Sequence, residues 1–134
     1  CGPADFLLGG KVEGGKEPSA ATLLLGGTIE EKRDAARQAS PITYVSKDDP
    51  PFLIVHGTHD STVPFAHAER FYEALKKAGC DATLVKIEGG GHGIGGPEVA
   101  QRVAAFLEKH LRAQDVEVSD EPIQAPAPKP AAKP

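Results

Sequence analysis

Two short loops in the second half of the chain carry side chains that could do acid–base chemistry together. The first loop, His56–Pro64, contains Asp60, and the second, Gly89–Gly93, contains His92. A histidine that moves protons needs a carboxylate at its Nδ1–H, which fixes the tautomer and stabilises the imidazolium. The glycines beside His92 allow a sharp turn and leave the imidazole uncrowded. The two loops therefore predict a carboxylate–histidine pair that could serve as the acid and the base of a nucleophilic mechanism.

Each of these loops follows a predicted strand. The run Phe52–His56 is apolar throughout, as is typical of a strand that is buried on both faces, and Ala82–Ile87 is a second strand. A helix over Pro64–Ala78 joins them, and a second helix begins at Pro97 and ends near Leu111. Strands joined by a helix in this way lie parallel, so both loops open onto the same edge of the sheet.

This arrangement makes two geometric predictions. The Asp60 carboxylate and an imidazole nitrogen of His92 should lie within hydrogen-bond reach, about 2.6–3.2 Å. The apolar period of the helix over 64–78 should turn some side chains inward and leave the charged ones solvated. The inward residues are Phe71 and Leu75, and the outward ones are Glu69, Arg70 and Lys77.

The same residues also have other interpretations. Asp60 could simply satisfy the backbone amides of a turn, and His92 could be a solvated residue of a glycine loop. A metal site from His56, His59, Asp60 and His92 would have suitable donors. However, His56 ends a buried strand, where we expect it to donate to a backbone carbonyl, and His59 should be exposed at the loop tip. We expect no metal and no cofactor, and we expect His67 and His110 to be half-exposed packing residues.

Length and composition limit the remaining possibilities. The chain has 134 residues, no methionine, a net charge of −4 and 25% charged residues of both signs, so it forms one domain at most and lacks the basic face typical of nucleic-acid binding. No apolar run is long enough to span a membrane. The two cysteines, Cys1 and Cys80, make no disulfide framework, and Cys80 is expected to be a small buried residue. The compartment stays open, with a secreted or periplasmic location among the possibilities.

The two ends of the chain differ from its centre. Residues 6–40 are expected to form a small helical insertion, in which Thr28 and Glu31 have capping-box spacing and start a helix that Ser40-Pro41 ends. Residues 11–20 are polar and glycine-rich and should form a loop. Residues 113–134 are rich in proline and alanine, and we expect a disordered tail. The folded part would then be residues 1–112.

The segment from Ser40 to Gly93 resembles the esterase/lipase branch of the α/β-hydrolases. The resemblance lies in the form His-Gly-x-x-Asp-x-x-Val-Pro at 56–64 and the Gly-His-Gly turn at 91–93, and it extends over about residues 1–112. The nearest enzymes are acetylesterase-like and feruloyl-esterase-like, and prolyl-oligopeptidase-type serine peptidases are more distant. The resemblance implies the C-terminal part of an α/β-hydrolase fold, with parallel strands and flanking helices. It also implies that Asp60 is the catalytic acid and His92 the catalytic histidine.

One part of the family pattern is absent. The nucleophile of these enzymes lies in Gly-x-Ser-x-Gly, and none of the serines has those flanking glycines; they are Ser19, Ser40, Ser46, Ser61 and Ser119. The upstream oxyanion turn of His-Gly-Gly type is missing too. The expectation is that the nucleophile half of the same domain is missing, and that residues 1–134 alone are inactive. The intact enzyme would hydrolyse a small-molecule carboxylic ester; the alternatives are a serine peptidase and a non-catalytic binding domain on the same fold.

Overall fold

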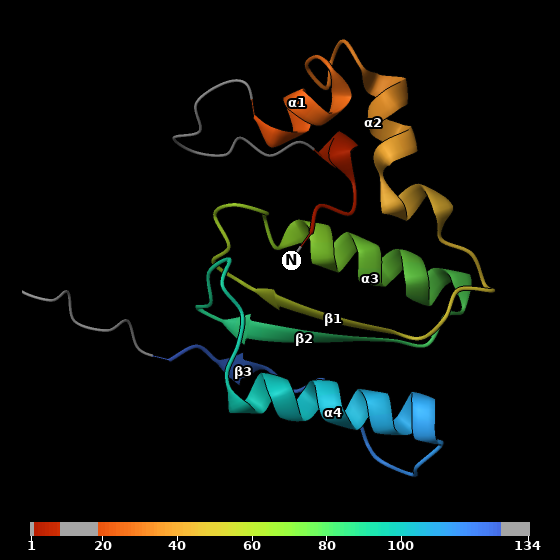
Figure 1. Ribbon diagram of the computed structural model, residues 1–134, viewed down its shortest axis with the longest axis vertical. Helices are drawn as coiled ribbons and strands as arrows, with labels where there is room; N and C mark the ends of the chain where they lie inside the picture. The colour runs from red at the N-terminus through yellow and green to blue at the C-terminus, as the bar shows by residue number, and fades with distance from the viewer. Residues whose placement is uncertain (1, 9–18, 127–134) are drawn as a thin grey trace, which may run out of the picture.

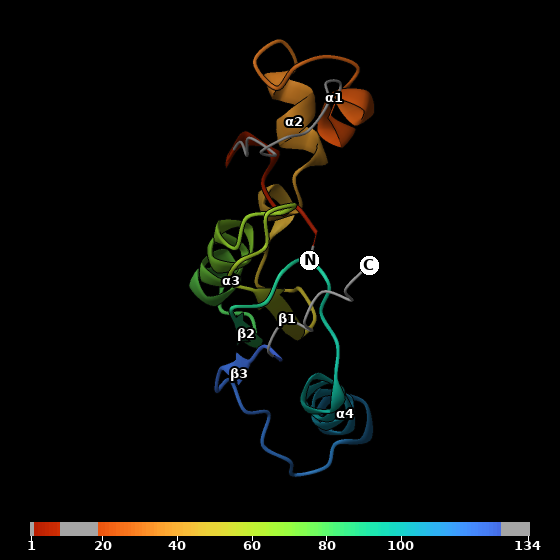
Figure 2. The same ribbon diagram turned by 90° about the vertical axis from the view of Figure 1, so that its left-hand side faces the viewer.

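A parallel three-stranded sheet organises the chain. The computed structural model describes residues 2–8 and 19–126. In those residues the strand order is β1-β2-β3, where β1 is Phe52–Gly57, β2 is Ala82–Glu88 and β3 is Ile123–Gln124. Helix α3, Ala66–Ala78, and helix α4, Pro97–Arg112, lie on opposite faces of this sheet (Figures 1 and 2). The predicted succession of strand, helix, strand and helix is confirmed.

The register of β1 and β2 brings the two loops of interest to the same edge. The pairing is parallel and runs from Phe52↔Ala82 to Gly57↔Ile87. Both strands therefore end at the same level, and the polypeptide leaves both of them in the same direction. This confirms the parallel pairing that the sequence predicted, and it places the loops after β1 and β2 side by side.

Apolar residues pack against both faces of the sheet. On the α3 face Leu75, Cys80 and Ala82 form a buried cluster, against which Phe52 and Phe71 pack. On the α4 face the buried cluster contains Val85, Ile87 and Ile123, and side chains of β1 and of the start of α4 pack against it. Alternate residues of β1 thus serve both faces, as expected for a strand without a solvated side.

Cys80 and the C-terminal end of α3 agree with the sequence analysis, whereas the helix begins at Ala66, two residues after the predicted Pro64. The Cys80 thiol is buried, and it donates to the Ser46 carbonyl oxygen at 2.9 Å. Helix α3 ends at Gly79, whose φ of 90° is left-handed and whose N–H donates to the carbonyl groups of Leu75 and Lys76. Glycine adopts this conformation without the steric cost that a Cβ would add.

The burial order along α3 also agrees with the prediction, with two corrections. Leu75 is fully buried, Phe71 and Glu69 are half-buried, and Arg70 and Lys77 are exposed. Arg70 is nevertheless no simple solvated residue, because its guanidinium lies 3.2 Å from the carboxylate of Asp5, which is largely buried. The expectation for His67 was wrong. His67 is only 5% exposed, and this burial lowers the pKa of its imidazole.

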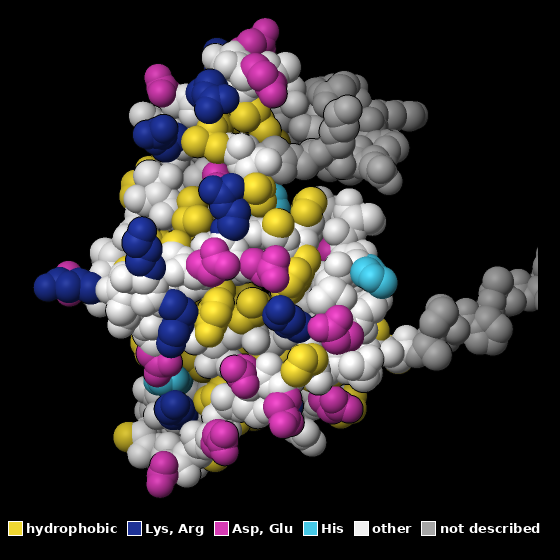
Figure 3. Space-filling view, turned by 180° about the vertical axis from the view of Figure 1, so that it is seen from behind, with side chains coloured by type: hydrophobic (Ala, Val, Ile, Leu, Met, Phe, Trp, Pro, Cys, Tyr) yellow, Lys and Arg dark blue, Asp and Glu magenta, His cyan; other side chains and the backbone are white. Residues whose placement is uncertain are grey.

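Charged side chains of both signs are interspersed on the face shown in Figure 3. One pair joins α3 to the sheet, since the Lys86 ammonium on β2 lies 3.7 Å from the Glu69 carboxylate. Both side chains are half-exposed, so solvent screens this pair and it contributes little to stability. Within the described residues no helix is long and apolar enough to cross a bilayer.

The N-terminal segment, which was expected to be a helical insertion, forms a small layer beyond α3 (Figure 1). Its elements are the 3-10 turn η1, Phe6–Leu8, the helices α1, Ala20–Leu25, and α2, Arg33–Ala39, and the 3-10 turn η2, Pro41–Tyr44. Of the loop expected at 11–20, residues 11–18 lie outside the described residues. Ser19 instead caps α1 by accepting from Thr22 N, and Ala20 is already helical.

The capping box before α2 forms, but it does not start the helix at once. Thr28 N donates to Glu31 Oε2 at 3.0 Å, and Glu31 N donates to Thr28 Oγ1 at 3.3 Å. These bonds close a turn, and the helix proper begins at Arg33. It ends at Ala39 as predicted, because Ser40 precedes a proline and is extended, with ψ of 114°.

The C-terminal part differs most from expectation. Helix α4 has the predicted bounds within one residue, but none of its residues is buried, and Leu111 is 77% exposed. The expected disorder of residues 113–134 is wrong at Ile123–Gln124, which form β3 and pair parallel with Ile87 and Glu88. Ile123 supplies the apolar side chain that makes this possible, and it is 6% exposed. Residues 127–134 of the expected tail lie outside the described residues.

The fold predicts a large difference between two leucines. Leu75→Ala should lower the free energy of unfolding by about 2–5 kcal/mol, because it leaves a cavity in a closed cluster. Leu111→Ala, the matched control on exposed surface, should change it by less than about 0.5 kcal/mol. Urea unfolding followed by circular dichroism measures both, and equal effects would contradict the core described for α3.

Candidate active site

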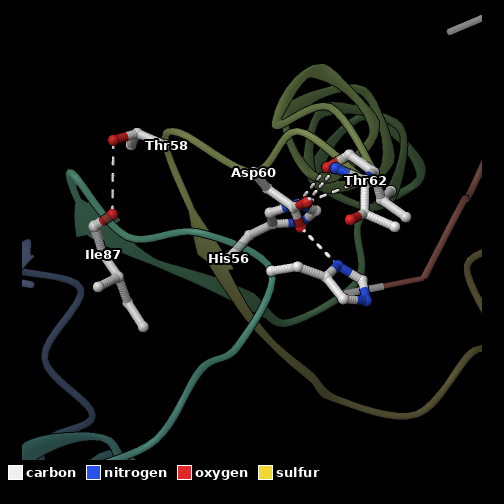
Figure 4. Close-up of polar contacts among 7 residues, drawn as sticks. His56, Thr58, Asp60, Thr62 and Ile87 are labelled. Atoms are coloured by element: carbon white, nitrogen blue, oxygen red, sulfur yellow. Dashed lines mark hydrogen bonds and ion pairs between the residues drawn. The ribbon is translucent and has the colours of Figure 1, made fainter. Parts of the chain in front are cut away.

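Asp60 closes the turn that follows β1. Its Oδ1 accepts hydrogen bonds from the backbone N–H groups of Thr62 and Val63, each at 2.9 Å (Figure 4). The carboxylate is completely shielded from solvent. Asp60 therefore does satisfy the backbone amides of a turn, as one interpretation expected. These hydrogen bonds occupy only Oδ1, one of its two carboxylate oxygens.

The second oxygen of Asp60 faces His92. Its Oδ2 lies 2.9 Å from His92 Nδ1, inside the range that the sequence analysis predicted. The carboxylate can only accept, so Nδ1 carries the proton and Nε2 keeps its lone pair. The imidazole is 48% exposed. Within the described part of the chain, no group bonds to Nε2, which leaves this nitrogen able to accept a proton from a substrate or a nucleophile.

A second imidazole contacts the same carboxylate. His56 Nε2 lies 2.8 Å from the carbonyl oxygen of Val63 and 3.0 Å from Asp60 Oδ2 (Figure 4). Since a carbonyl oxygen only accepts, Nε2 of His56 must carry its proton. The expectation that His56 donates to a backbone carbonyl is confirmed, and His59 is exposed as expected. The contact between His56 and Asp60 was not anticipated.

The hydrogen bonds decide the ionisation of Asp60. Burial raises the pKa of its carboxyl group, but the donors around it oppose that effect. The N–H of Val63, the imidazole of His92 and the N–H of Thr62 together hold the pKa of Asp60 below its ordinary value. Asp60 is therefore an anion at neutral pH, which is the form that can orient His92 and stabilise its protonated state.

Backbone contacts between the two loops bring these side chains together. Thr58 N donates to the Ile87 carbonyl oxygen at 3.0 Å, and His59 N donates to the Gly90 carbonyl oxygen at 2.8 Å. Thr58 Oγ1 also accepts from Gly89 N at 2.9 Å. The loop after β1 and the loop after β2 thus form a short zipper directly beside Asp60 and His92.

Glycine is required where this zipper is tightest. A Cβ on Gly57 would lie 2.3 Å from the Gly90 carbonyl oxygen, and a Cβ on Gly90 would lie 2.7 Å from the Ile87 side chain. Gly89 has a φ of 73°, which is left-handed. By contrast, a Cβ on Gly91 or Gly93 would meet nothing within 4 Å. Steric constraints therefore favour glycine at positions 57, 89 and 90, whereas the open space at Gly91 and Gly93, which flank His92, does not require it.

Sequence reasoning found the pair but missed its supports. Gly57 belongs to the His-Gly-x-x-Asp motif, but this motif predicts only the role of Asp60. The close approach of the Gly90 backbone is what excludes a side chain at position 57. Thr58 gave no signal at all. The described residues contain no group of three or more His, Cys, Asp or Glu side chains that could hold a metal ion. A hollow of about 320 Å³ runs along β1 and does not lie over His92; its wall includes His67, Ala68 and Phe71.

The BD-FAE family model matches residues 1–75, which is more than half of the chain and includes Asp60. The chain belongs to the BD-FAE family. Esterases are among its relatives and among the solved structures that superpose on it, so the α/β-hydrolase fold that the sequence resemblance implied is confirmed.

Two relatives and one solved structure show which kinds of protein this BD-FAE chain is similar to. It is 33% identical to Esterase LipC of Mycobacterium tuberculosis over 95 residues, covering 65% of the chain and 23% of that protein. It is 36% identical to the uncharacterized peptidase YuxL of Bacillus subtilis over 55 residues, covering 41% of the chain and 8% of that protein. A truncated carbohydrate esterase from gut microbiota superposes with a TM-score of 0.58 at 34% identity, covering 60% of the chain and 29% of that structure. The chain thus spans less than a third of either esterase, 23% of LipC and 29% of the carbohydrate esterase.

The steric role of Gly57 can be tested within the zipper. Gly57→Ala should destabilise the protein by about 1–3 kcal/mol, because its methyl group collides with backbone that cannot rotate away. Gly91→Ala is the matched control in the partner loop, and it should change stability by less than about 0.5 kcal/mol because the space is open. Thermal unfolding of both variants measures the difference. A Gly57→Ala protein as stable as the wild type would contradict the close approach.

The ionisation of Asp60 predicts a pH-dependent contribution to stability. Because the folded pKa lies below the unfolded value of about 3.9, this contribution is complete above pH ~4 and is lost as the pH falls through the folded pKa. Asp60→Asn cannot titrate, so the wild type should exceed it in stability at pH 7 and lose that advantage at low pH. Urea unfolding between pH 2 and 7 measures this, with exposed Asp48→Asn as the control. A gap that did not change with pH would show that Asp60 is not the titrating group.

Proposed function

We propose that Asp60 and His92 are the acid and the general base of a serine hydrolase that cleaves carboxylic esters. The observation that carries this proposal is the 2.9 Å contact between a fully buried carboxylate and a half-exposed imidazole. A structural ion pair would not need one nitrogen of the ring left available. The esterases among the relatives support the same reaction class.

In the proposed mechanism His92 moves one proton twice. Its Nε2 takes the proton of the serine hydroxyl as the serine oxygen attacks the ester carbonyl, and Asp60 stabilises the imidazolium that forms. The imidazolium then returns the proton to the leaving alcohol, which leaves an acyl-enzyme. Water attacks the acyl-enzyme in the same manner, with His92 as base, and releases the carboxylic acid. None of these steps requires a metal or an organic cofactor.

We propose that the nucleophile comes from residues outside these 134. No serine of the chain has the Gly-x-Ser-x-Gly environment that gives the strained, exposed turn of an α/β-hydrolase nucleophile. Asp60 and His92 occur in the order that follows such a serine in this fold. Residues 1–134 alone should therefore lack the alkoxide that the pair exists to generate.

A serine peptidase is the second candidate, favoured by the similarity to YuxL. The same acid, base and nucleophile cleave amides and esters, and the difference lies in the pocket and in protonation of an amine leaving group. Esters of small acyl groups or aryl alcohols are the substrate class that we propose, because the relatives LipC and LipM, which match 65% and 50% of this chain, are named an esterase and a probable carboxylic ester hydrolase. A non-catalytic domain on this fold is the outcome if neither substrate class is turned over.

The test uses the protein as its gene encodes it, including any residues that precede Cys1. An aryl acetate should be hydrolysed, Asp60→Asn should reduce kcat by about 10⁴-fold, and His92→Ala should reduce it at least as much. His59→Ala, an exposed side chain in the same loop, is the control and should keep its rate. A peptide anilide assayed in parallel separates esterase from peptidase.

Residues 1–134 on their own should show no hydrolysis above a buffer control. Ester turnover by this polypeptide that disappears in His92→Ala would contradict an external nucleophile. Wild-type rates in Asp60→Asn or His92→Ala of the complete protein would contradict the proposed roles of both residues.

A further inference from the structure

The segment after α4 returns to the sheet beside the loop that carries His92. Helix α4 ends at Arg112, its C-cap residue Ala113 is left-handed with φ of 51°, and Gln114 N donates to the Glu108 carbonyl oxygen at 3.2 Å. From this point the chain runs back past α4 and reaches β2, where it forms β3 (Figures 1 and 2). The last regular element of the described chain thus lies next to a loop that ended some thirty residues earlier.

Strand β3 makes both polar and apolar contacts there. Ile123 pairs with Ile87 and is buried in one cluster with Ile87 and Val85. Gln124 pairs with Glu88, and Ala125 N donates to the Glu88 carbonyl oxygen at 2.9 Å. In the described residues β3 pairs only with the last two residues of β2.

Those two residues are the base of the His92 loop. Glu88 is followed directly by Gly89, and Gly90 N folds back to donate to the Ile87 carbonyl oxygen at 3.0 Å. Ile87 is held from the other side by Thr58 N. The peptide groups from which the loop departs are therefore fixed between β1 on one side and β3 on the other.

The location of β3 argues against a role as a simple edge cover. A strand that only protected the free edge of β2 could pair anywhere along Ala82–Glu88, and a longer strand would protect it better. Instead a strand of two residues pairs only at the end nearest His92. This short pairing, at the residues directly before the His92 loop, is suited to fixing that loop.

We propose that β3 fixes the loop that carries His92, and that Ile123 and Ala125 are positioning residues for this histidine. The value of such a restraint for catalysis rests on the function proposed for His92. The chain of contacts runs from Ala125 N to Glu88, through Gly89 to Gly90, and from the Gly90 carbonyl to His59 N beside Asp60. Releasing the first contact should loosen the others along this path and leave the centre of the sheet unchanged.

The test replaces one hydrogen-bond donor. Ala125→Pro removes the N–H that donates to Glu88, and it suits the extended conformation that proline requires of the preceding residue Gln124. Ala125→Ser is the matched control, because it keeps the N–H at the same position. Hydrogen exchange of backbone amides and the lifetime of the His92 Nδ1 proton are measured by NMR on residues 1–134 and on the complete protein.

In Ala125→Pro the amides of Gly90 and His59 and the His92 Nδ1 proton should exchange at least tenfold faster than in Ala125→Ser. The amides of Ile54 and Leu84, in the middle of the β1–β2 ladder, should keep their protection. Ile123→Ala, which weakens the apolar contact only, should shift the same protons in the same direction by a smaller factor.

Two results would overturn the proposal. The first is equal exchange at Gly90, His59 and His92 in the proline and serine variants. The second is a uniform acceleration that includes Ile54 and Leu84, which would make β3 a contributor to overall stability only. Neither result depends on ester hydrolysis, so a failure of the proposed function, seen as turnover that does not need His92, remains a separate finding.

Discussion

The buried carboxylate of Asp60 is the constraint from which the arrangement of the site follows. An ionised carboxylate removed from water is tolerated only if its oxygens accept enough hydrogen bonds to replace hydration. Two backbone N–H groups, from Thr62 and Val63, bind Oδ1, and the imidazole of His92 binds Oδ2. His56 lies against Oδ2 as well. The backbone donors come from the same turn, so its shape is set by the charge that it surrounds.

This requirement joins two distant segments of sequence. The turn of Asp60 is local, but His92 must be brought in from the next strand, and the zipper between Thr58, His59 and the Gly89–Gly90 backbone does so. The parallel register of β1 and β2 aligns the two loops. Because Gly57 has no side chain, the Gly90 backbone can then pack directly against it. The geometry of the Asp60–His92 pair thus rests largely on backbone groups, whose residue types do not point to this role.

That division explains which features could be predicted from the sequence. The pairing of Asp60 with His92 follows from a general rule, that loops after parallel strands meet at one edge, combined with two residues whose chemistry is recognisable. Strand β3 could not be predicted, because Ile123 stands alone between polar residues and prolines and shows no period. The burial of His67 and the ion pair of Arg70 depend on the N-terminal segment that lies over α3, and no periodicity within a helix contains that information.

The two loops of the site differ in how much change in length they could absorb during evolution. Two kinds of contact fix the length from His56 to Asp60: the side chains at its ends touch at 3.0 Å, and Thr58 N and His59 N donate to the neighbouring strand end and loop. An inserted residue there would break the contact of the carboxylate. Beyond His92 the situation is reversed, since side chains at Gly93 and Gly95 would meet nothing within 4 Å. Related proteins can therefore vary the connection from His92 to α4 while inheriting the segment from His56 to Asp60 at constant length.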